Sequence, residues 1–311
     1  MSHLLKSRSR NSAFTLVELL IVIAIIGILA SLATVGVMKV LERSKLVTAR
    51  IEISQLEAAV SAAKLDLGNV DALPSRIRLA YSYSNFQSPT QLTGVETASE
   101  FALRVSTWET IKKVFGKTIT GSTSRSGNYF NWRGVGNVPN ATTPFLTLEG
   151  MDAYVFWLGG IPENGKFTGF ASSRTDPTLS EASVSKRKGP YYDFDTTRIN
   201  GSFASGKVGY NNSYGGAYAY ISNKDYDYFT VVPLNGVYPY RNSDNPVTNP
   251  NYTPFYTASS YYNSKTFQII SSGQDQSFGP GGYYQPPLVI GSAGYDDLSN
   301  FSSTQLGKKD E

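Results

Sequence analysis

The sequence predicts an α+β fold in which one long N-terminal helix packs on a small antiparallel sheet with long loops. Three observations lead to this prediction. An uncharged apolar run covers residues 19–38, an amphipathic pattern continues it to residue 67, and short strand-like segments alternate with turn residues after residue 160. The chain has 311 residues, of which 41% are hydrophobic, so we expect a folded region beyond the first helix.

The apolar run near the N-terminus is long enough to cross a membrane. Residues 19–38 carry no charge, and about 20 helical residues span the hydrocarbon core of a bilayer. Lys6, Arg8 and Arg10 precede the run, and no acidic residue lies before Glu18. Positive charge on the N-terminal side predicts that the N-terminus lies in the cytoplasm and that the chain after the run lies outside it.

One carboxylate, Glu18, lies at the start of this run, and a plain membrane anchor leaves it unexplained. Ionisable groups in membrane spans are costly and usually have a partner. A cleaved secretory signal is the simpler alternative. However, the apolar run is longer than such a signal has, and the small residue Ala13 precedes the run instead of following it.

The stretch AFTLVELLIVIAIIGILA, residues 13–30, resembles the class III signal of type IV pilins and type II secretion pseudopilins. The resemblance implies that prepilin peptidase cleaves between Ala13 and Phe14, that Phe14 becomes N-methylated, and that Glu18 is the fifth residue of the mature chain. It also implies that Glu18 pairs with the Phe14 amine of a neighbouring subunit during filament assembly. The family usually has glycine where this chain has Ala13.

This interpretation divides the chain into five parts. We expect a leader peptide at residues 1–13, the membrane half of the long helix at 14–38 and its amphipathic half at 39–67. A helical head region is expected at 68–160, and a second head region, rich in tyrosine and glycine, at 161–311.

The amphipathic half of the helix is predicted from apolar residues at spacings of three and four. These residues are Leu46, Ala49, Ile53, Leu56, Val60, Ala63 and Leu67, and the polar residues Glu52, Gln55, Glu57 and Lys64 are placed on other faces. Gly68 and Asn69 predict the end of the helix.

Two further helices and four strands are predicted in the head. Thr97 with Glu100 forms a capping-box pattern that begins a helix ending at Gly116, and the apolar residues 148–160 predict a shorter helix. The strand candidates are residues 216–222, 226–232, 266–271 and 287–291. Most of the 21 tyrosines follow residue 160. We expect them to cover sheet edges and interfaces, and sugar binding is the alternative.

The composition excludes several kinds of chemistry. The chain has no cysteine and one histidine, His3, which lies in the predicted leader. The mature chain would therefore lack the residues of Ser-His-Asp and Cys-His catalysis and of the usual zinc sites. We expect no enzyme, because Glu149, Asp152 and Glu163 share no recognisable catalytic spacing, although an exported carboxylate enzyme stays open as an alternative.

The net charge gives no support for a nucleic-acid partner. Of the 28 basic residues, three lie in the predicted leader, which leaves 25 basic against 24 acidic residues in the mature chain. A nearly neutral chain lacks the basic surface that binds nucleic acid.

The C-terminal region carries candidate calcium ligands. Residues 265–302 resemble the terminal strand and loop of the major type II pseudopilins, in which acidic side chains and backbone carbonyls bind calcium. The resemblance places Asp275 on the first acid of that loop and Asp296 and Asp297 on the later pair, with Gln276 where the family has glycine. Calcium takes six to eight oxygen ligands, so these carboxylates suit it. Solvated loop acids are the alternative.

The predicted function is structural. We expect a filament subunit that resembles a type II secretion pseudopilin, with copies of itself, other pseudopilins and the prepilin peptidase as partners. Before assembly it would cross the inner membrane once with its head in the periplasm, and after assembly it would lie in a periplasmic or cell-surface filament. The large region at about 75–260 keeps alternatives open. These are a minor or tip pilin, and a membrane-anchored module that binds a polysaccharide or a secreted substrate.

Overall fold

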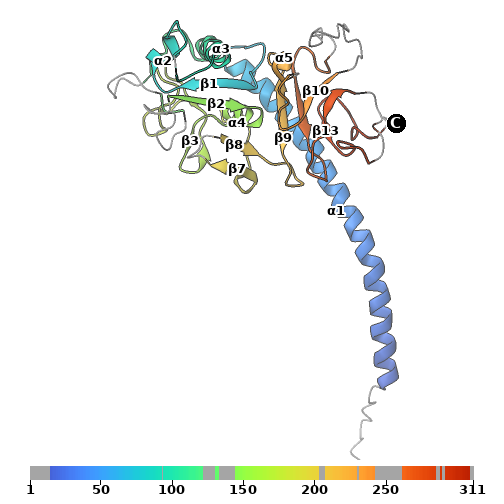
Figure 1. The fold of residues 1–311 in the computed structure, drawn as a ribbon. Coiled ribbons are helices and arrows are strands. Elements are labelled where there is room, and N and C mark those ends of the chain that lie inside the picture. The colour runs from blue at the N-terminus through green and yellow to red at the C-terminus, as the bar shows by residue number, and fades with distance from the viewer. Residues whose placement is uncertain are drawn as a thin grey trace, which may run out of the picture. The chain divides into compact units, whose positions relative to one another are not determined.

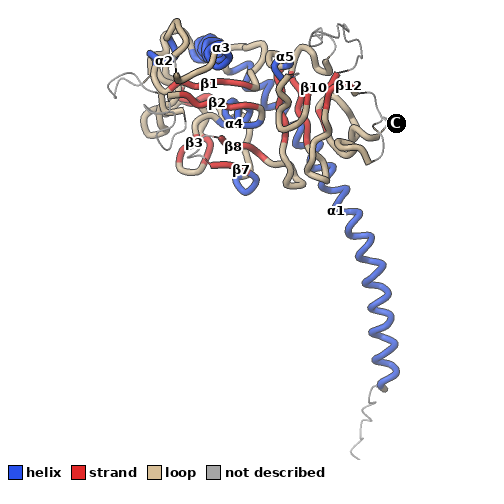
Figure 2. Tube along the Cα trace, in the orientation of Figure 1, coloured by secondary structure: helices blue, strands red, loops and turns tan. Residues whose placement is uncertain are grey.

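The computed structural model describes residues 15–92, 94–121, 130–132, 144–202, 207–229, 231–241, 261–284, 288 and 291–308. The chain divides into two compact units, Met1–Val47 and Thr48–Glu311. As the sequence predicts, the fold is α+β and combines a long N-terminal helix with small, mostly antiparallel sheets (Figure 1, Figure 2).

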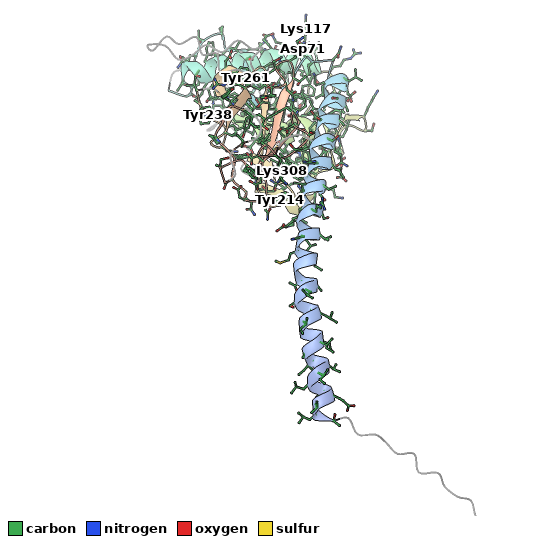
Figure 3. The ribbon with its side chains drawn as sticks, turned by 90° about the vertical axis from the view of Figure 1, so that its right-hand side faces the viewer. Asp71, Lys117, Tyr214, Tyr238, Tyr261 and Lys308 are labelled. Atoms are coloured by element: carbon green, nitrogen blue, oxygen red, sulfur yellow. The ribbon has the colours of Figure 1, made fainter. Side chains whose placement is uncertain are left out.

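The first unit contains the apolar part of helix α1, which runs over Leu16–Asp66. Its described side chains up to Leu41 are exposed on all sides of the helix (Figure 3). Leu20 and Leu32, for example, are 56% and 69% exposed. Exposing so much apolar surface to water is unfavourable. By length and composition this helix could cross a membrane, as predicted.

In the second unit, the rest of α1 packs against the head through the predicted apolar stripe. Its buried members are Ala49, Ile53, Leu56, Val60, Ala63 and Leu67. Gly68 and Asn69 then take positive φ angles of 93° and 53°, and they end the helix where the sequence predicts. One polar position was predicted wrongly, because Glu52 lies in the buried stripe and is only 5% exposed.

The first part of the head is built around an antiparallel pair of strands, β1 (Arg76–Ala80) and β2 (Phe145–Glu149). Helix α3 (Ala98–Phe115) packs on β1, and helix α4 (Met151–Gly159) contacts β2 (Figure 1). The short helix α2 (Tyr83–Gln87) packs on α3. The two longer helices confirm the sequence prediction, whereas this strand pair was not predicted.

Local capping explains the start of α3. The Thr97 hydroxyl accepts a hydrogen bond from the Glu100 N–H, and the Glu100 carboxylate accepts one from the Thr97 N–H. This is the predicted capping box, and Gly116 ends the helix as predicted.

The second part of the head contains a three-stranded antiparallel sheet in the order β13-β11-β9. The strands are β9 (Tyr218–Ser222), β11 (Phe267–Ser271) and β13 (Leu298–Ser299). Two of the predicted strands are therefore confirmed. The predicted strand at 226–232 is wrong, because Tyr226–Phe229 forms the helical turn α5. The predicted strand at 287–291 lies largely outside the described residues.

Short strand pairs complete the head. They are β3 (Pro162–Glu163) with β4 (Lys166–Phe167), β5 (Phe170–Ala171) with β6 (Arg187–Lys188), β7 (Ile199–Ser202) with β8 (Lys207–Tyr210), and the parallel pair β10 (Tyr238–Arg241) with β12 (Gly281–Tyr283). A 3₁₀ helix covers Thr196–Arg198. As divisions between parts of the chain, the predicted boundaries at residues 13, 38, 67 and 160 stay predictions.

Candidate functional site

The start of helix α1 forms a small hydrogen-bonded motif around Glu18. Glu18 Oε2 accepts hydrogen bonds from the Thr15 N–H and the Thr15 hydroxyl, each at 2.8 Å. The Glu18 N–H donates to Thr15 Oγ1 at 3.3 Å. These bonds form a capping box, which satisfies two N–H groups at the open end of the helix.

This capping box directs the Glu18 carboxylate back toward the N-terminal side of its own helix. Thr15 is the residue that follows the predicted first mature residue, Phe14. The carboxylate is therefore held at the end of the helix where cleavage would create a new amine. The predicted cleavage residues, Ala13 and Phe14, lie outside the described residues.

The acidic loop near the C-terminus connects two turns through Asp296. Asp296 Oδ2 accepts hydrogen bonds from the N–H groups of Gln274 and Asp275. Gly273 adopts a φ of +59°, and a Cβ atom there would lie 2.5 Å from Asp296 Oδ2, so only glycine fits. Gln276, where the resembled family has glycine, also takes a positive φ, of 61°. The turn thus keeps a backbone conformation that favours glycine.

Asp297, the next residue, is fully buried. Its Oδ2 accepts a hydrogen bond from the Gly279 N–H at 2.9 Å, whereas the buried Oδ1 has no hydrogen-bond partner among the described residues. Burial raises the pKa of Asp297 to about 7, and the negative charges of Asp296 and Asp275 add to this rise. A buried carboxylate with one unpaired oxygen is an unfavourable arrangement that a proton or a cation would relieve.

The structure thus places the three predicted metal-ligating residues in one pair of turns but does not bring them together as a cluster. Among the described residues, no group of three or more His, Cys, Asp or Glu side chains could hold a metal ion. Asp296 and Asp275 each use an oxygen to accept backbone N–H groups. The free Oδ1 of Asp297 is the atom that fits a cation best, because it is buried and unpaired.

A second polar cluster, which the sequence analysis missed, surrounds Glu52 on α1. Its carboxylate accepts hydrogen bonds from Arg198 Nη2 at 2.6 Å and from the hydroxyls of Tyr218, Tyr210 and Tyr192 at 2.5, 3.0 and 3.2 Å. We call these four donors the Glu52 clamp. They lie 140 to 166 residues away from Glu52 in sequence, so no local pattern could reveal the contact.

The electrostatics of the Glu52 clamp keep its donors protonated. Burial and the negative charge of Glu52 raise the pKa of Tyr210 to about 12, and they also raise the pKa of Tyr218 well above its usual value. At neutral pH both hydroxyls therefore carry the proton that they donate to the carboxylate.

Other tyrosines of the head also donate to the first helix and the segment after it. The hydroxyl of Tyr154 donates to the Leu56 carbonyl, and that of Tyr220 donates to the Leu73 carbonyl. Tyr191 donates to Asp66 Oδ2 at 2.6 Å. These three rings therefore act in internal packing, whereas the sequence analysis expected the tyrosines to cover sheet edges and interfaces.

The carboxylates considered for an enzyme alternative have structural contacts. Glu149 forms an ion pair with Arg76 at 2.9 Å, and Glu163 accepts the N–H of Glu181 at 2.9 Å. Asp152 lines a cavity of about 30 Å³, which has room for a water molecule.

Comparison with known proteins assigns the N-terminal segment. Residues 8–34 match the family model described as the prokaryotic N-terminal methylation motif. The chain therefore carries a type IV pilin-like prepilin signal together with an N-terminal apolar helix that could span a membrane. The motif implies processing by prepilin peptidase and assembly into pilin-like filaments. No curated protein and no solved structure matches the chain significantly.

Proposed function

We propose that this chain is a structural subunit of a pilin-like filament and that it acts as a type II secretion pseudopilin. The observation that carries the proposal is the methylation motif at residues 8–34, which includes the start of helix α1, whose described apolar side chains up to Leu41 are exposed on every side. Such a helix needs lipid around it before assembly and other helices around it afterwards.

Glu18 supports the same role. Its carboxylate is fixed by Thr15 at the end of the apolar helix, so it is oriented before any partner arrives. A cationic amine on Phe14 of a neighbouring subunit would supply the charge that makes this acid tolerable in an apolar bundle. A single acid in an uncharged run then favours one axial stagger between subunits.

Cleavage of the leader and methylation of Phe14 are the first test of this proposal. When the chain is produced together with a prepilin peptidase, we expect mass spectrometry of the mature protein to show the loss of residues 1–13 and a methylated Phe14 amine. Periplasmic filaments should then form on overproduction. Filaments whose subunits still begin at Met1 would contradict the proposal.

We further propose that the acidic loop binds calcium through Asp297. Calcium would neutralise a buried carboxylate that also experiences the charges of Asp296 and Asp275. In a chain without cysteines, the ion would hold the two turns together in place of a disulfide. The unpaired Oδ1 of Asp297 supports this proposal.

Calcium is expected to raise the melting temperature most above pH 7. At pH 8, saturating calcium should raise it by about 5 °C relative to a chelator. Because the pKa of Asp297 is raised to about 7, its carboxyl binds a proton at pH 5, and calcium would have to displace it, so the shift should be smaller. Differential scanning calorimetry measures the calcium-induced shift in melting temperature at both pH values.

Two variants test the position of the ion. Asp297→Asn should abolish the calcium-induced shift, and Asp193→Asn, at an exposed residue, should keep it. An equal shift in both variants would place the ion elsewhere.

A further inference from the structure

The second half of helix α1 has two apolar faces, and only one of them contacts the head. The buried face includes Ala49, Leu56 and Val60. At about 100° per residue, Ile51, Ala58, Ala62 and Leu65 lie about half a turn away and form a second apolar face. This second face is exposed, with Ile51 at 54% and Leu65 at 72%. Both faces of this part of α1 therefore carry apolar residues, although the buried face, which also includes Ile53, Ala63 and Leu67, carries more of them.

At one equivalent position the two faces differ in charge. On the buried face Glu52 follows Ala49 by three residues and precedes Leu56 by four. On the exposed face Ser54 holds the same place between Ile51 and Ala58. Turning the helix by about half a turn would exchange these faces and bring Ser54 toward the donors that now contact Glu52.

The Glu52 clamp is specific for a carboxylate. Its four donors converge on the two oxygens of Glu52, and Arg198 adds a positive charge at 2.6 Å. A serine hydroxyl has one oxygen and no charge, so most of these donors would lose their acceptor. Buried donors without an acceptor, and a partly buried guanidinium without an anion, strongly disfavour the turned arrangement.

We propose that Glu52 is a positioning residue that sets the rotational orientation of helix α1 in the head. Through the clamp it selects the face of α1 that is buried and leaves the face with Ile51 and Leu65 outward. Only one part of this inference rests on the proposed filament role, namely that the outward face would be available to neighbouring subunits. The orientation itself is a property of a single chain and can be measured without filaments.

Cysteine reporters in the otherwise cysteine-free chain test this orientation. Ile51→Cys and Ile53→Cys are made singly in the full-length protein in detergent, and their rates of maleimide labelling are normalised to the denatured chain. In the parent, residue 51 should label at least tenfold faster than residue 53, which is 4% exposed. The key background is the exchange Glu52→Ser with Ser54→Glu, which preserves composition and net charge while moving the carboxylate to the other apolar face.

In the exchanged background, labelling should fall at least tenfold at residue 51 and rise at residue 53, because the helix turns to return a carboxylate to the clamp. Simple loosening of the helix would raise labelling at residue 53 without protecting residue 51. An unchanged or faster rate at residue 51 in the exchanged background would overturn the proposal, whether or not residue 53 opens. Glu57→Gln is the matched control. Glu57 lies at the edge of the buried stripe and accepts a hydrogen bond from the Asn300 side chain, so this variant should leave both labelling rates as in the parent.

Discussion

Replacing Glu18 with alanine is expected to leave the chain inserted in the membrane and to reduce filament assembly about 100-fold. The variant removes an acid from the start of the apolar helix, so insertion becomes no harder. In the proposed filament it would leave the amine of a neighbouring Phe14 without its counter-charge. Removing one member of a buried ion pair costs about 3–5 kcal/mol, and about 3 kcal/mol corresponds to a factor of about 100 in association. Membrane fractionation and electron microscopy of sheared filaments measure the two effects.

Two further variants separate the charge of Glu18 from its capping role. Glu18→Gln keeps an acceptor for the Thr15 N–H and hydroxyl but removes the charge, so it should fail to assemble like the alanine variant. Thr15→Val removes the hydroxyl but keeps the charge, and it should retain most assembly. Normal filaments from Glu18→Gln, together with defective ones from Thr15→Val, would show that capping is the function of Glu18 and would contradict the proposed pairing.

The elements that the sequence predicts correctly are those whose signals are local. Helix α3 begins at the Thr97–Glu100 capping box and ends at Gly116, and all three residues lie within the element or next to it. The buried stripe of α1 follows from spacings of three and four. Such patterns need no knowledge of distant parts of the chain.

The strand predicted at residues 226–232 fails because its aromatic pattern has two interpretations. Tyr226 and Tyr228 alternate as in a strand, but Tyr226 and Phe229 are three residues apart and share one face of a helical turn. Both are buried in the cluster that includes Ile221 and Ile270. Packing against the three-stranded sheet, which forms between distant segments, therefore decided the local conformation.

The candidate sites show the same limit. The resemblance proposed Asp275, Asp296 and Asp297 as candidate calcium ligands, but it did not show which of them is buried, because burial of Asp297 depends on the chain around Gly279 and Leu306. Glu52 looked like a solvent-facing acid of an amphipathic helix. Its donors come from residues more than a hundred positions away, so only the folded head reveals its role.

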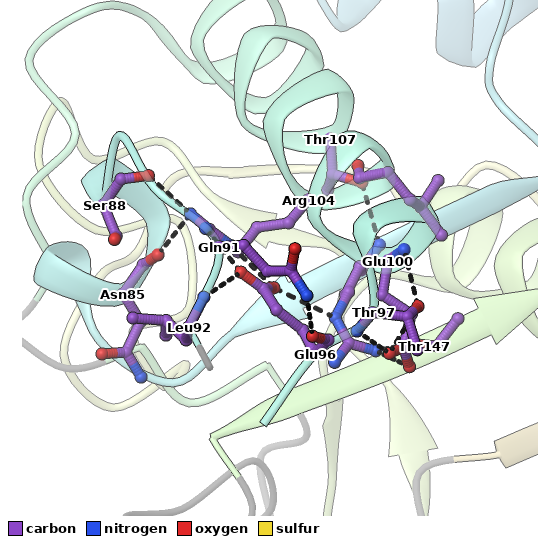
Figure 4. A network of polar contacts seen from close by, with 12 residues as sticks. Asn85, Ser88, Gln91, Leu92, Glu96, Thr97, Glu100, Arg104, Thr107 and Thr147 are labelled. Atoms are coloured by element: carbon purple, nitrogen blue, oxygen red, sulfur yellow. Dashed lines mark hydrogen bonds and ion pairs between the residues drawn. The ribbon is translucent and has the colours of Figure 1, made fainter. Parts of the chain in front are cut away.

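A buried ion pair in the head provides the second large expected effect. Arg104 and Glu96 have fully buried side chains and form two hydrogen bonds, from Nη2 at 2.8 Å and from Nε at 3.1 Å (Figure 4). Burial alone would raise the pKa of Glu96, but the bonds from Arg104 and from the Leu92 N–H outweigh it and hold that pKa below its usual value. The carboxylate is therefore charged at neutral pH and balances the guanidinium.

Glu96→Ala is expected to lower the free energy of unfolding by about 3–5 kcal/mol, because it leaves the Arg104 charge buried without an anion. For a chain of this size the melting temperature should fall by about 10 °C, which thermal unfolding followed by circular dichroism would measure. Glu149→Gln is the matched control. Glu149 pairs with Arg76 near the surface, where solvent weakens the interaction, so the shift should be much smaller. Equal shifts in the two variants would contradict the importance of burial.

Replacing both partners distinguishes the ion pair from the other contacts of Arg104. Its guanidinium also donates to four backbone carbonyls, those of Asn85, Phe86, Ser88 and Thr90, and so holds the segment before α3 against that helix. An apolar pair can often substitute for a buried ion pair without loss. Here Glu96→Leu with Arg104→Met should still unfold at a much lower temperature than the parent, because the four carbonyls lose their donor. Recovery of the parent melting temperature would show that these four carbonyls need no donor and that charge balance alone explains the pair.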